Sequence, residues 1–455
     1  MAMIRMPERV WTAVHQHLFS SAGEHFAFLQ ASWTSSLGEP VFIVRDAILV
    51  PDDHVHRSRS GWELTTEGII DVINTAVRSN DVLVEVHNHG GIRPRFSRTD
   101  RDGLQSFPSY VMSSLPGRPY GATVWGDSTI YGEFFLPDGR SGAINSIVVV
   151  GERFQQLVSR DDDTRHVASA FDRQLPWFTT EGQRALGRIR VGIVGNGGTG
   201  SQLLQNLVYL GVRDFVLIDD DDADTTSMNR LVTATAADIG TPKSMLGRRF
   251  VKSIAPEASV MVIGEKVQSI NAVDVLKGVD ILFGCFDNDG ARLVLNEIAL
   301  AYSIPYFDLG VGIEIENETV TVAGGRVIAV LPNGPCLHCM KQIDVEEARF
   351  FLSNVKEQEH QVARGYVHGM EVKAPSVVSL NATIAAVATN EFAVYVSGIR
   401  PVNVHTDLDI LGVGRPLKTQ WITPIRATID PTCVQCPLAG IGDDAHIERF
   451  SRSLN

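Results

Sequence analysis

The sequence lacks long apolar runs, and no segment approaches the roughly 18 uncharged apolar residues that suggest a membrane helix. Positive charge is also scarce, because 40 Lys and Arg stand against 53 Asp and Glu and give a formal net charge of -13. An acidic chain is poorly suited to bind nucleic acid or anionic lipid, so we expect neither a nucleic-acid nor a membrane partner. The N-terminal segment lacks the apolar core of a signal peptide, which predicts a cytoplasmic protein.

The chain also has no internal repeat and no low-complexity tract. Its apolar fraction of 44 % is ordinary for globular proteins, so sizeable hydrophobic cores can form. A length of 455 residues exceeds one ordinary domain. We therefore expect two or three folded domains.

Cysteine is rare, with five residues, of which four form two Cys-x-x-Cys pairs. Two disulfides, or a thioredoxin-like redox pair, would use the same residues. In a reducing compartment, two converging pairs favour a closed, structural zinc site, formed by Cys336, Cys339, Cys433 and Cys436. The remaining Cys285 is interpreted as a small buried hydrophobe.

The most informative stretch covers residues 190–230. An apolar run at 191–194 predicts a buried strand, and helical spacing over 201–210 predicts a helix after it. Between them lie glycines that allow a tight turn and the approach of a phosphate to backbone N–H groups: Gly195, Gly197, Gly198 and Gly200. Asp219 ends the next strand, where a carboxylate can bind a ribose hydroxyl.

A glycine-rich turn alone would also fit a Rossmann dehydrogenase or a tight turn without a ligand. The charged and polar residues that follow favour an enzyme that attacks the α-phosphate of ATP. Cations offset the charge that grows on pyrophosphate, and a carboxylate can hold Mg²⁺. The candidate residues are Asp219, Asp221, Asn229, Arg230, Lys243, Asp287 and Asn288.

These segments resemble the ThiF/MoeB family of adenylating enzymes, which includes the ubiquitin-activating enzymes. The matching segments are GNGGTGS, DDDDADTTSMNRL, Lys243 and DNDGARLVLN, within a resemblance that covers roughly residues 170 to 440. Ser227 and Leu231 depart from the family's asparagine and glutamine. The resemblance implies a Rossmann-like, doubly wound adenylation domain over 183–455 with the cysteines as its structural zinc site.

The same resemblance implies roles for individual residues. Asp219 would hold the ribose, Arg230 and Lys243 the phosphates, and Asp287 the Mg²⁺ ion. Arg173 would reach the ATP of a neighbouring subunit, which implies a homodimer through this domain. We further expect parallel strands alternating with helices, and an antiparallel pair of strands, 318–323 and 326–331, around Gly324 and Gly325.

A second constellation lies near the N-terminus, after an apolar strand expected at 82–86. His87 and His89 alternate along the chain, so their side chains can point the same way and share a metal ion. Asp100 can add a third ligand, and three ligands leave the open position of a catalytic zinc site. Ser97 lies three residues before Asp100.

The spacing H-x-H-x(7)-S-x(2)-D is similar to the JAMM signature of the JAB/MPN metalloproteases, over about residues 15 to 150. The resemblance implies an α/β zinc peptidase domain at 1–155, followed by a linker and lead-in helix at 156–182. It implies that His87, His89 and Asp100 bind zinc, that Ser97 stabilises the oxyanion and that Glu24 is the general base. Glu24 would otherwise be an ordinary surface glutamate.

Together the two resemblances predict a bifunctional enzyme that uses ATP, Mg²⁺ and Zn²⁺. One domain would adenylate the C-terminal glycine of a ubiquitin-like protein, and the other would cleave its tail or its conjugates. A conjugating enzyme would be a further partner. Two alternatives stay open: activation of a sulfur-carrier protein for cofactor synthesis, and a domain that only binds the partner.

Overall fold

The computed structural model describes residues 2–57, 62–89, 94–126, 129–158, 167–353, 375–411 and 422–444. The chain divides into two compact units, Met1–His166 with Gly440–Asp444, and Val167–Ala439 with Ala445–Asn455. Residues 440–444 thus join the first unit, whereas we expected all of 183–455 to form the adenylation domain. Part of the expected linker, 159–166, lies outside the described residues.

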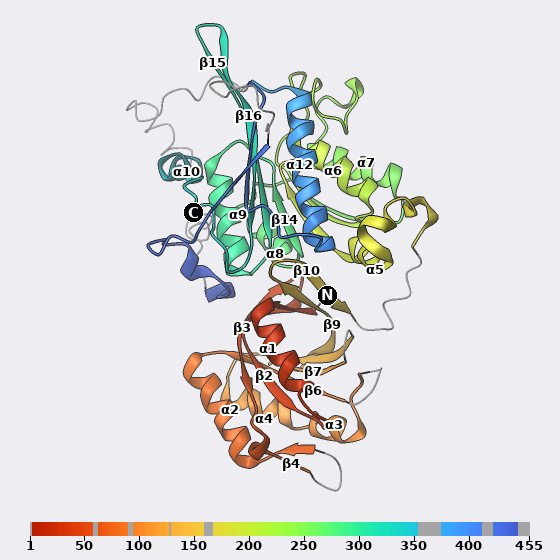
Figure 1. Ribbon diagram of the computed structural model, residues 1–455, viewed down its shortest axis with the longest axis vertical. Coiled ribbons are helices and arrows are strands. Elements are labelled where there is room, and N and C mark those ends of the chain that lie inside the picture. Colours follow the sequence, from red (N-terminus) through yellow and green to blue (C-terminus); the bar gives the residue numbers. More distant parts are fainter. Residues whose placement is uncertain are drawn as a thin grey trace. The chain divides into compact units, whose positions relative to one another are not determined.

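The first unit is built on one mixed sheet with the strand order β1-β3-β2-β6-β7-β8-β9-β10 (Figure 1). Strand β1 also pairs with β9, so the sheet closes on itself. The strands are β1 (Ala2–Pro7), β2 (Phe26–Ser36), β3 (Glu39–Leu49), β6 (Val82–Asn88), β7 (Tyr120–Trp125), β8 (Ile130–Phe135), β9 (Ser141–Val150) and β10 (Phe154–Val158). A separate hairpin joins β4 (Val55–Arg57) to β5 (Trp62–Leu64).

Helices bury apolar side chains against both faces of this sheet. α1 (Glu8–Leu18) packs into a core with Val82, Val84 and Val86 of β6. Leu83 points the other way, into a core that includes residues of α2 (Thr66–Ser79) and α4 (Phe107–Ser114). Because side chains alternate along a strand, Glu85 and His87 lie on the same face of β6 as Leu83.

The second unit contains an eight-stranded sheet of order β13-β12-β11-β14-β15-β16-β17-β18. Pairing is parallel from β13 to β15 and antiparallel from β15 to β18. The strands are β11 (Arg190–Val194), β12 (Asp214–Ile218), β13 (Ser259–Ile263), β14 (Ile281–Gly284), β15 (Tyr306–Glu316), β16 (Thr319–Val330), β17 (His405–Asp409) and β18 (Ile422–Ile425). The predicted Rossmann-like α/β fold is confirmed, with an antiparallel extension.

Helices cover both faces of this sheet. Figure 1 shows α6, α7 and α12 on one side of the strands and α9 on the other. The helices of this unit are α5 (Leu175–Arg188), α6 (Gly198–Leu210), α7 (Lys243–Ile254), α8 (Ile270–Leu276), α9 (Asp289–Ala301), α10 (Val345–Leu352) and α12 (Val378–Ser397). The helices after β11, β12 and β14 begin at one edge of the sheet, where their N-termini can face a ligand.

The expected antiparallel pair around Gly324 and Gly325 was wrong. β16 is one continuous strand through both glycines, and its antiparallel partner is β15. The hairpin turn lies at Asn317 and Glu318, which both have positive φ, 48° and 62°. A Cβ on Gly324 or Gly325 would collide with a carbonyl oxygen of the neighbouring strand, so these glycines allow close approach of strands instead of a turn.

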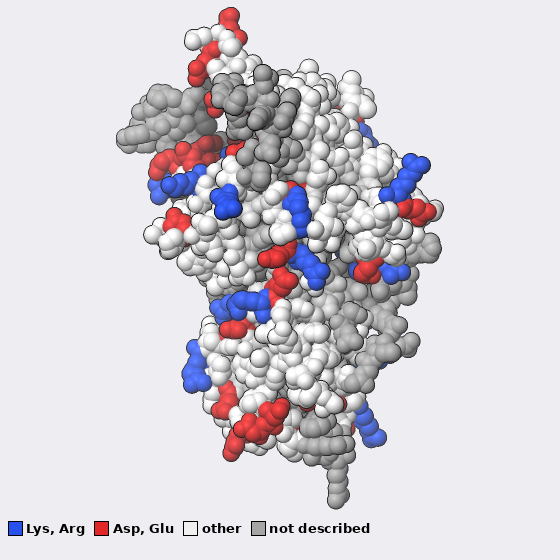
Figure 2. All heavy atoms as spheres, viewed as in Figure 1, with Lys and Arg blue, Asp and Glu red and all other residues white. Residues whose placement is uncertain are grey.

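Within the described ranges, no helix combines the length and apolarity needed to cross a membrane. Figure 2 shows one face of the molecule, on which acidic and basic side chains are interspersed among uncharged ones.

Candidate functional site

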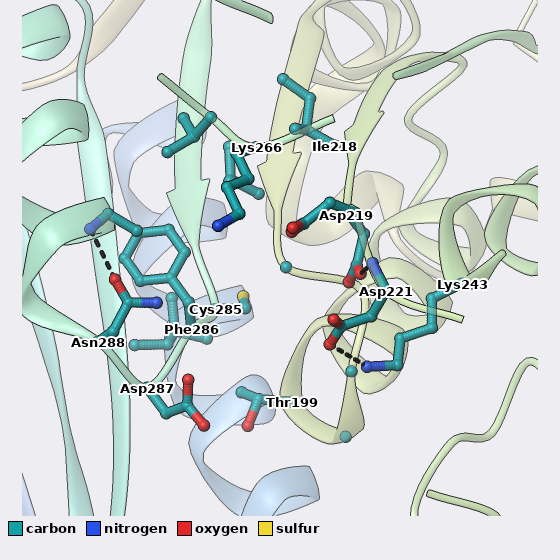
Figure 3. Close-up of a pocket in the computed structure, with 18 of the residues that line it drawn as sticks. Thr199, Ile218, Asp219, Asp221, Lys243, Lys266, Cys285, Phe286, Asp287 and Asn288 are labelled. Atoms are coloured by element: carbon teal, nitrogen blue, oxygen red, sulfur yellow. Dashed lines mark hydrogen bonds and ion pairs between the residues drawn. The ribbon is translucent and has the colours of Figure 1, made fainter. Parts of the chain in front are cut away.

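A cavity of about 570 Å³ lies in the second unit. It opens at the carboxyl ends of β11, β12 and β14, where the strand order reverses and open α/β sheets bind ligands. Figure 3 shows side chains from these strand ends pointing into it. The predicted residues among its lining are Gly195, Gly197, Gly198, Asp219, Asp221, Arg230, Lys243, Asp287 and Asn288.

The turn after β11 needs glycine at its first position. Gly195 has φ of +88°, which side-chain-bearing residues rarely adopt, and a Cβ there would lie 2.5 Å from the carbonyl oxygen of Cys285. Helix α6 begins three residues later, at Gly198. The sequence therefore places backbone N–H groups of a helix N-terminus at the wall of the cavity.

The acidic residues after β12 are held by backbone and by Lys243. Asp219, 9 % exposed, accepts hydrogen bonds from the N–H groups of Asn196 (2.5 Å) and Asp221 (2.9 Å). Burial raises the pKa of Asp219, although these backbone bonds oppose the rise. Lys243 at the start of α7 donates to Asp221 at 2.6 Å, with its side chain only 14 % exposed against 68 % for Asp221. The cavity thus holds a cation fixed at a helix N-terminus.

The turn after β14 supplies Asp287 and Asn288. The Oδ1 atom of Asn288 accepts from the N–H of Ala291 at 2.8 Å, so this side chain caps α9. Asn288 also lines the cavity, and its expected role in binding a cofactor stays a prediction. Asp287 is exposed and lines the cavity with its carboxylate (Figure 3).

Three predicted residues are not among those that line the described cavity. Gly200 is buried within α6. Asn229 is exposed and accepts from Nη1 of its neighbour Arg230 at 3.1 Å. Arg173 is exposed just before α5, and its action on a second subunit stays a prediction.

Sequence reasoning missed other residues of the cavity. Lys266 follows β13, and Figure 3 shows its ammonium group directed into the space. Asn381 of α12 accepts from Thr199 Oγ1 at 3.3 Å and donates to Ser376 Oγ at 3.1 Å. Asn381 is 2 % exposed. In the sequence, the one indication of its role is that a polar amide lies within a helix of small apolar residues, where a buried amide needs hydrogen-bond partners.

Cys285 differs from the expected buried hydrophobe. It is half-buried and lines the cavity beside the glycine-rich turn. Burial, and then the nearby carboxylate of Asp308, raise the pKa of its thiol far above the ordinary value. A thiol held protonated is a poor nucleophile, so Cys285 is poorly suited to form a thioester.

The four other cysteines converge in the second unit. Their Sγ atoms are 3.8 Å apart for Cys336 and Cys339, 3.6 Å for Cys336 and Cys433, and 3.3 Å for Cys339 and Cys436. A tetrahedron with Zn–S bonds of roughly 2.3 Å has edges of about 3.8 Å. Disulfide-bonded sulfurs would be about 2.05 Å apart. The donor set therefore fits one zinc ion and not two disulfides.

Asn296 of α9 joins the two cysteine pairs. It is fully buried, its Oδ1 accepts from the N–H of Leu337 at 3.0 Å, and its Nδ2 donates to Oε1 of Gln435. Leu337 lies between the first two cysteines and Gln435 between the other two. The asparagine that ends the motif DNDGARLVLN thus helps to bring the cysteine pairs together.

The first unit gathers the predicted metal ligands at the end of β6. Oδ2 of Asp100 lies 3.5 Å from Nε2 of His87 and 3.3 Å from Nε2 of His89. All three ligand atoms lie within 4.8 Å of one another. Oε1 of Glu24 lies 3.9 Å from Nε2 of His89, so the predicted general base borders the cluster.

The chemistry of these donors fits a metal ion. The His87 side chain is only 2 % exposed, and neither of its ring nitrogens has a well-aligned hydrogen-bond partner among the described residues. Burial disfavours the charged imidazole, but the carboxylates of Asp100 and Glu85 outweigh it and raise the pKa of His87 to about 9. Two imidazoles that converge on one carboxylate could therefore hold a metal ion with three ligands.

Ser97 has a structural role beside this cluster. Its Oγ accepts from the N–H of Asp100 at 3.2 Å, and the Asp100 carboxylate accepts from the N–H of Ser97 at 2.6 Å. This capping box begins α3 (Arg98–Gly103) and fixes the position of Asp100. Its expected role in stabilising an oxyanion stays a prediction.

Asn88, between the two histidines, holds the segment that carries Glu24. Its Oδ1 accepts from the N–H of His25 at 2.8 Å, and its Nδ2 donates to the carbonyl oxygen of Gly23 at 3.2 Å. These bonds flank Glu24 on both sides and are largely shielded, since Asn88 is 4 % exposed. Asn88 therefore links the strand of the ligands to the predicted base.

The second unit is a Rossmann-like α/β domain with its cavity at the carboxyl ends of the strands. The chain belongs to the ThiF family, whose model matches residues 171–413. It is 32 % identical to the SAMP-activating enzyme E1 of Haloferax volcanii over 160 residues, which is 35 % of this chain and 56 % of that enzyme. The matching part of the chain thus spans little more than half the length of that relative.

The chain is similar to another curated protein and to a solved structure. Identity to the sulfur carrier protein adenylyltransferase of Thermus thermophilus is 27 % over 179 residues, covering 39 % of this chain and 65 % of that protein. The crystal structure of E. coli MccB with ATP covers 59 % of this chain and 75 % of the MccB chain, with a TM-score of 0.45 and 17 % identity.

Proposed function

We propose that the second unit uses ATP to adenylate the C-terminal carboxylate of a sulfur-carrier or ubiquitin-like protein. The observation that carries this proposal is the cavity at the strand ends, which joins the glycine-rich turn to Asp219, Arg230, Lys243 and Asp287. Family membership supports it, as do the names of relatives that activate SAMP or sulfur-carrier proteins. These relatives favour carrier activation over isopeptide conjugation as the main role.

In the proposed reaction, a carboxylate oxygen of the carrier attacks the α-phosphorus of ATP. The bond from this phosphorus to the bridging oxygen breaks, and pyrophosphate leaves with the electron pair. Lys243 and Arg230 offset the charge that grows on the leaving group, and Asp219 orients the ribose. Mg²⁺ would be held at the exposed carboxylate of Asp287 and would neutralise phosphate charge.

The acyl-adenylate would pass to sulfur or to an amine supplied by a partner protein. We expect no stable thioester on this chain, because four of its five cysteines lie in the cluster that could hold a metal ion and burial raises the pKa of the Cys285 thiol. Mass spectrometry that maps a carrier thioester to Cys285 would contradict this part of the proposal. A thiocarboxylate on the carrier would identify sulfur transfer, and an isopeptide product would identify conjugation.

The test is ATP–pyrophosphate exchange driven by a purified carrier that ends in glycine. The wild-type chain should catalyse exchange that depends on the carrier, and both Arg230→Ala and Asp287→Ala should lose it. Unchanged exchange in both variants would contradict the assignment of the cavity as the adenylation site. Circular dichroism of each variant verifies that the fold is kept.

For the first unit we propose a zinc peptidase that trims the carrier's tail or releases its conjugates. The supporting observation is the convergence of His87, His89 and Asp100, with Glu24 beside them. Bound zinc would supply Lewis-acid polarisation of the scissile carbonyl, and Glu24 would take and return a proton. A carrier extended past its glycine should be cleaved by the wild type and not by Glu24→Ala.

A purely binding role for the first unit predicts a different result. Binding of the carrier would survive Glu24→Ala, and the wild type would not cleave the extended carrier. The expected homodimer and a conjugating partner stay predictions.

A further inference from the structure

Strand β6 carries a second carboxylate next to the histidine cluster. Oε1 of Glu85 lies 3.3 Å from Nδ1 of His87, the ring nitrogen that points away from Asp100. The two residues share a face of β6 because they are two positions apart. His87 therefore has a different carboxylate near each of its ring nitrogens.

Glu85 is itself fixed by the neighbouring strand. The hydroxyl of Tyr120 on β7 donates to its other oxygen, Oε2, at 2.6 Å. Tyr120 is fully buried, and the Glu85 side chain is 15 % exposed. This buried phenol can reach Glu85 because β6 and β7 are paired with Leu83 opposite Tyr120. Tyr120, Glu85 and His87 thus form a continuous chain of polar contacts under the cluster.

We propose that Glu85 is a positioning residue that orients the imidazole of His87 so that Nε2 points at the metal ion. A carboxylate beside the non-ligating nitrogen keeps the proton on that nitrogen, fixes the ring orientation and makes the other nitrogen a better ligand. Tyr120 holds Glu85 in place and occupies the oxygen that does not face His87. The inference rests on the proposed metal site of the first unit.

The arrangement separates Glu85 from the ligands themselves. Its near oxygen faces Nδ1 of His87, whereas the ligand set is built around Nε2 of both histidines and Asp100. A Gln at position 85 keeps an oxygen that can lie beside Nδ1 of His87, and its amide N–H can donate to the hydroxyl oxygen of Tyr120. The Glu85→Gln variant should therefore keep metal binding if Glu85 only positions His87, and should lose it if the Glu85 carboxylate binds the metal ion.

The test measures Co²⁺ binding to the full chain by visible absorption, after the cysteine cluster has been filled with Zn²⁺. Glu85→Ala should weaken Co²⁺ binding by about 10- to 100-fold and shift the ligand-field bands, because it removes a group that orients a metal ligand. Glu85→Gln should restore most of the affinity and the wild-type spectrum. Tyr120→Phe should weaken binding less than Glu85→Ala.

Glu133→Ala is the matched control. Oε1 of Glu133 also accepts from a tyrosine, Tyr131, at 3.1 Å, and its further contact is with Arg101, so it faces no histidine of the cluster. This variant should keep the wild-type affinity and spectrum. A thermal melt of every variant separates lost metal binding from lost folding.

Three results would overturn the proposal in distinguishable ways. Equal affinity and spectra in the wild type and Glu85→Ala would remove the positioning role while leaving the metal site intact. Equal losses in Glu85→Gln and Glu85→Ala would make Glu85 a metal ligand instead. If the wild type binds no Co²⁺ beyond the cysteine cluster, the metal site itself fails, and with it the peptidase proposal.

Discussion

The cysteine cluster of the second unit and the histidine cluster of the first unit differ in how completely they surround a metal ion. Four sulfurs at separations near the edge of a zinc tetrahedron leave no position for substrate. Two imidazoles and one carboxylate leave a position open. The two clusters thus differ in the number and kind of donors: four sulfurs form a closed set, whereas two imidazoles and one carboxylate form an open set.

The two clusters also differ in what supports their ligands. In the second unit, the amide of Asn296 bonds to residues inside both cysteine pairs. In the first unit, the Glu85 carboxylate lies beside the ring of His87, a predicted ligand, and Asn88 holds the segment that carries the predicted base. In the closed cluster the supporting bonds connect the two segments that carry the cysteines. In the open cluster the supporting contacts fix the orientation of a histidine ring and the position of the predicted base.

The largest effect should follow from breaking the closed cluster. Cys433→Ser leaves three thiolates, and structural zinc contributes folding free energy on the order of 10 kcal/mol. We expect loss of one zinc per chain and a large fall in the melting temperature, measured by metal analysis and calorimetry. Cys285→Ser, the matched control outside the cluster, should keep its zinc. Full zinc content in Cys433→Ser would contradict a four-cysteine site.

The next effect concerns the cavity that the cysteine cluster does not touch. Lys243→Ala removes a cation at the N-terminus of α7, and exchange of pyrophosphate into ATP should fall by about 10²- to 10³-fold. Lys252→Ala lies on the same helix, where Nζ donates to the carbonyl oxygen of Pro256, and should leave exchange unchanged. Equal rates for both variants would show that Lys243 does not act on the phosphates.

A smaller effect should follow from separating the cysteine pairs without changing a ligand. Asn296→Ala leaves the buried groups of Leu337 and Gln435 without their partner, at a cost of about 2 kcal/mol in unfolding free energy. Urea unfolding measures this loss of free energy. A chelator should also remove zinc from the Asn296→Ala variant faster than from the wild type. Asn206→Ala removes one partly buried bond, to Thr389, and should cost less. An unfolding free energy equal to the wild type would show that Asn296 does not join the pairs.

The smallest effect should be at the open cluster. Asn88→Ala removes the two bonds that flank Glu24, and cleavage of an extended carrier should fall by about tenfold, which corresponds to roughly 1.4 kcal/mol. The content of metal should not change, because Asn88 is not a ligand. Glu24→Ala should lose far more activity, since a general base contributes about 10²- to 10⁴-fold. A loss of metal in Asn88→Ala would assign it a different role.

The parts of the candidate site that could be predicted from the sequence are those that lie in motifs of fixed spacing. The glycine-rich turn, Asp219 and Asp287 each follow a short apolar strand, so their place at one edge of a parallel sheet could be derived from local pattern. The turn expected at Gly324 and Gly325 was wrong, because glycine is found both in turns and where strands approach each other closely. Distinguishing these requires the neighbouring strand, which comes from residues distant in sequence.

Other features depended on contacts that no local pattern contains. Asn381 of α12 contacts Thr199 of the glycine-rich segment, although the two residues are 182 positions apart in the chain. Pairing of β1 with β9 closes the first sheet, and residues 440–444 join that unit through Ser32 and Thr34. Asn288 lines the cavity, and its side chain also caps α9, which its motif did not indicate.

The most direct test of the central claim is carrier-dependent ATP–pyrophosphate exchange with a free or an amidated carrier C-terminus. A suitable probe is a purified ubiquitin-like or sulfur-carrier protein that ends in glycine. Exchange should occur with the free glycine carboxylate and should be absent with the amide, because only the carboxylate can attack the α-phosphorus. Equal exchange with the amidated carrier, or no exchange with the free carboxylate, would contradict adenylation of the carrier's C-terminus.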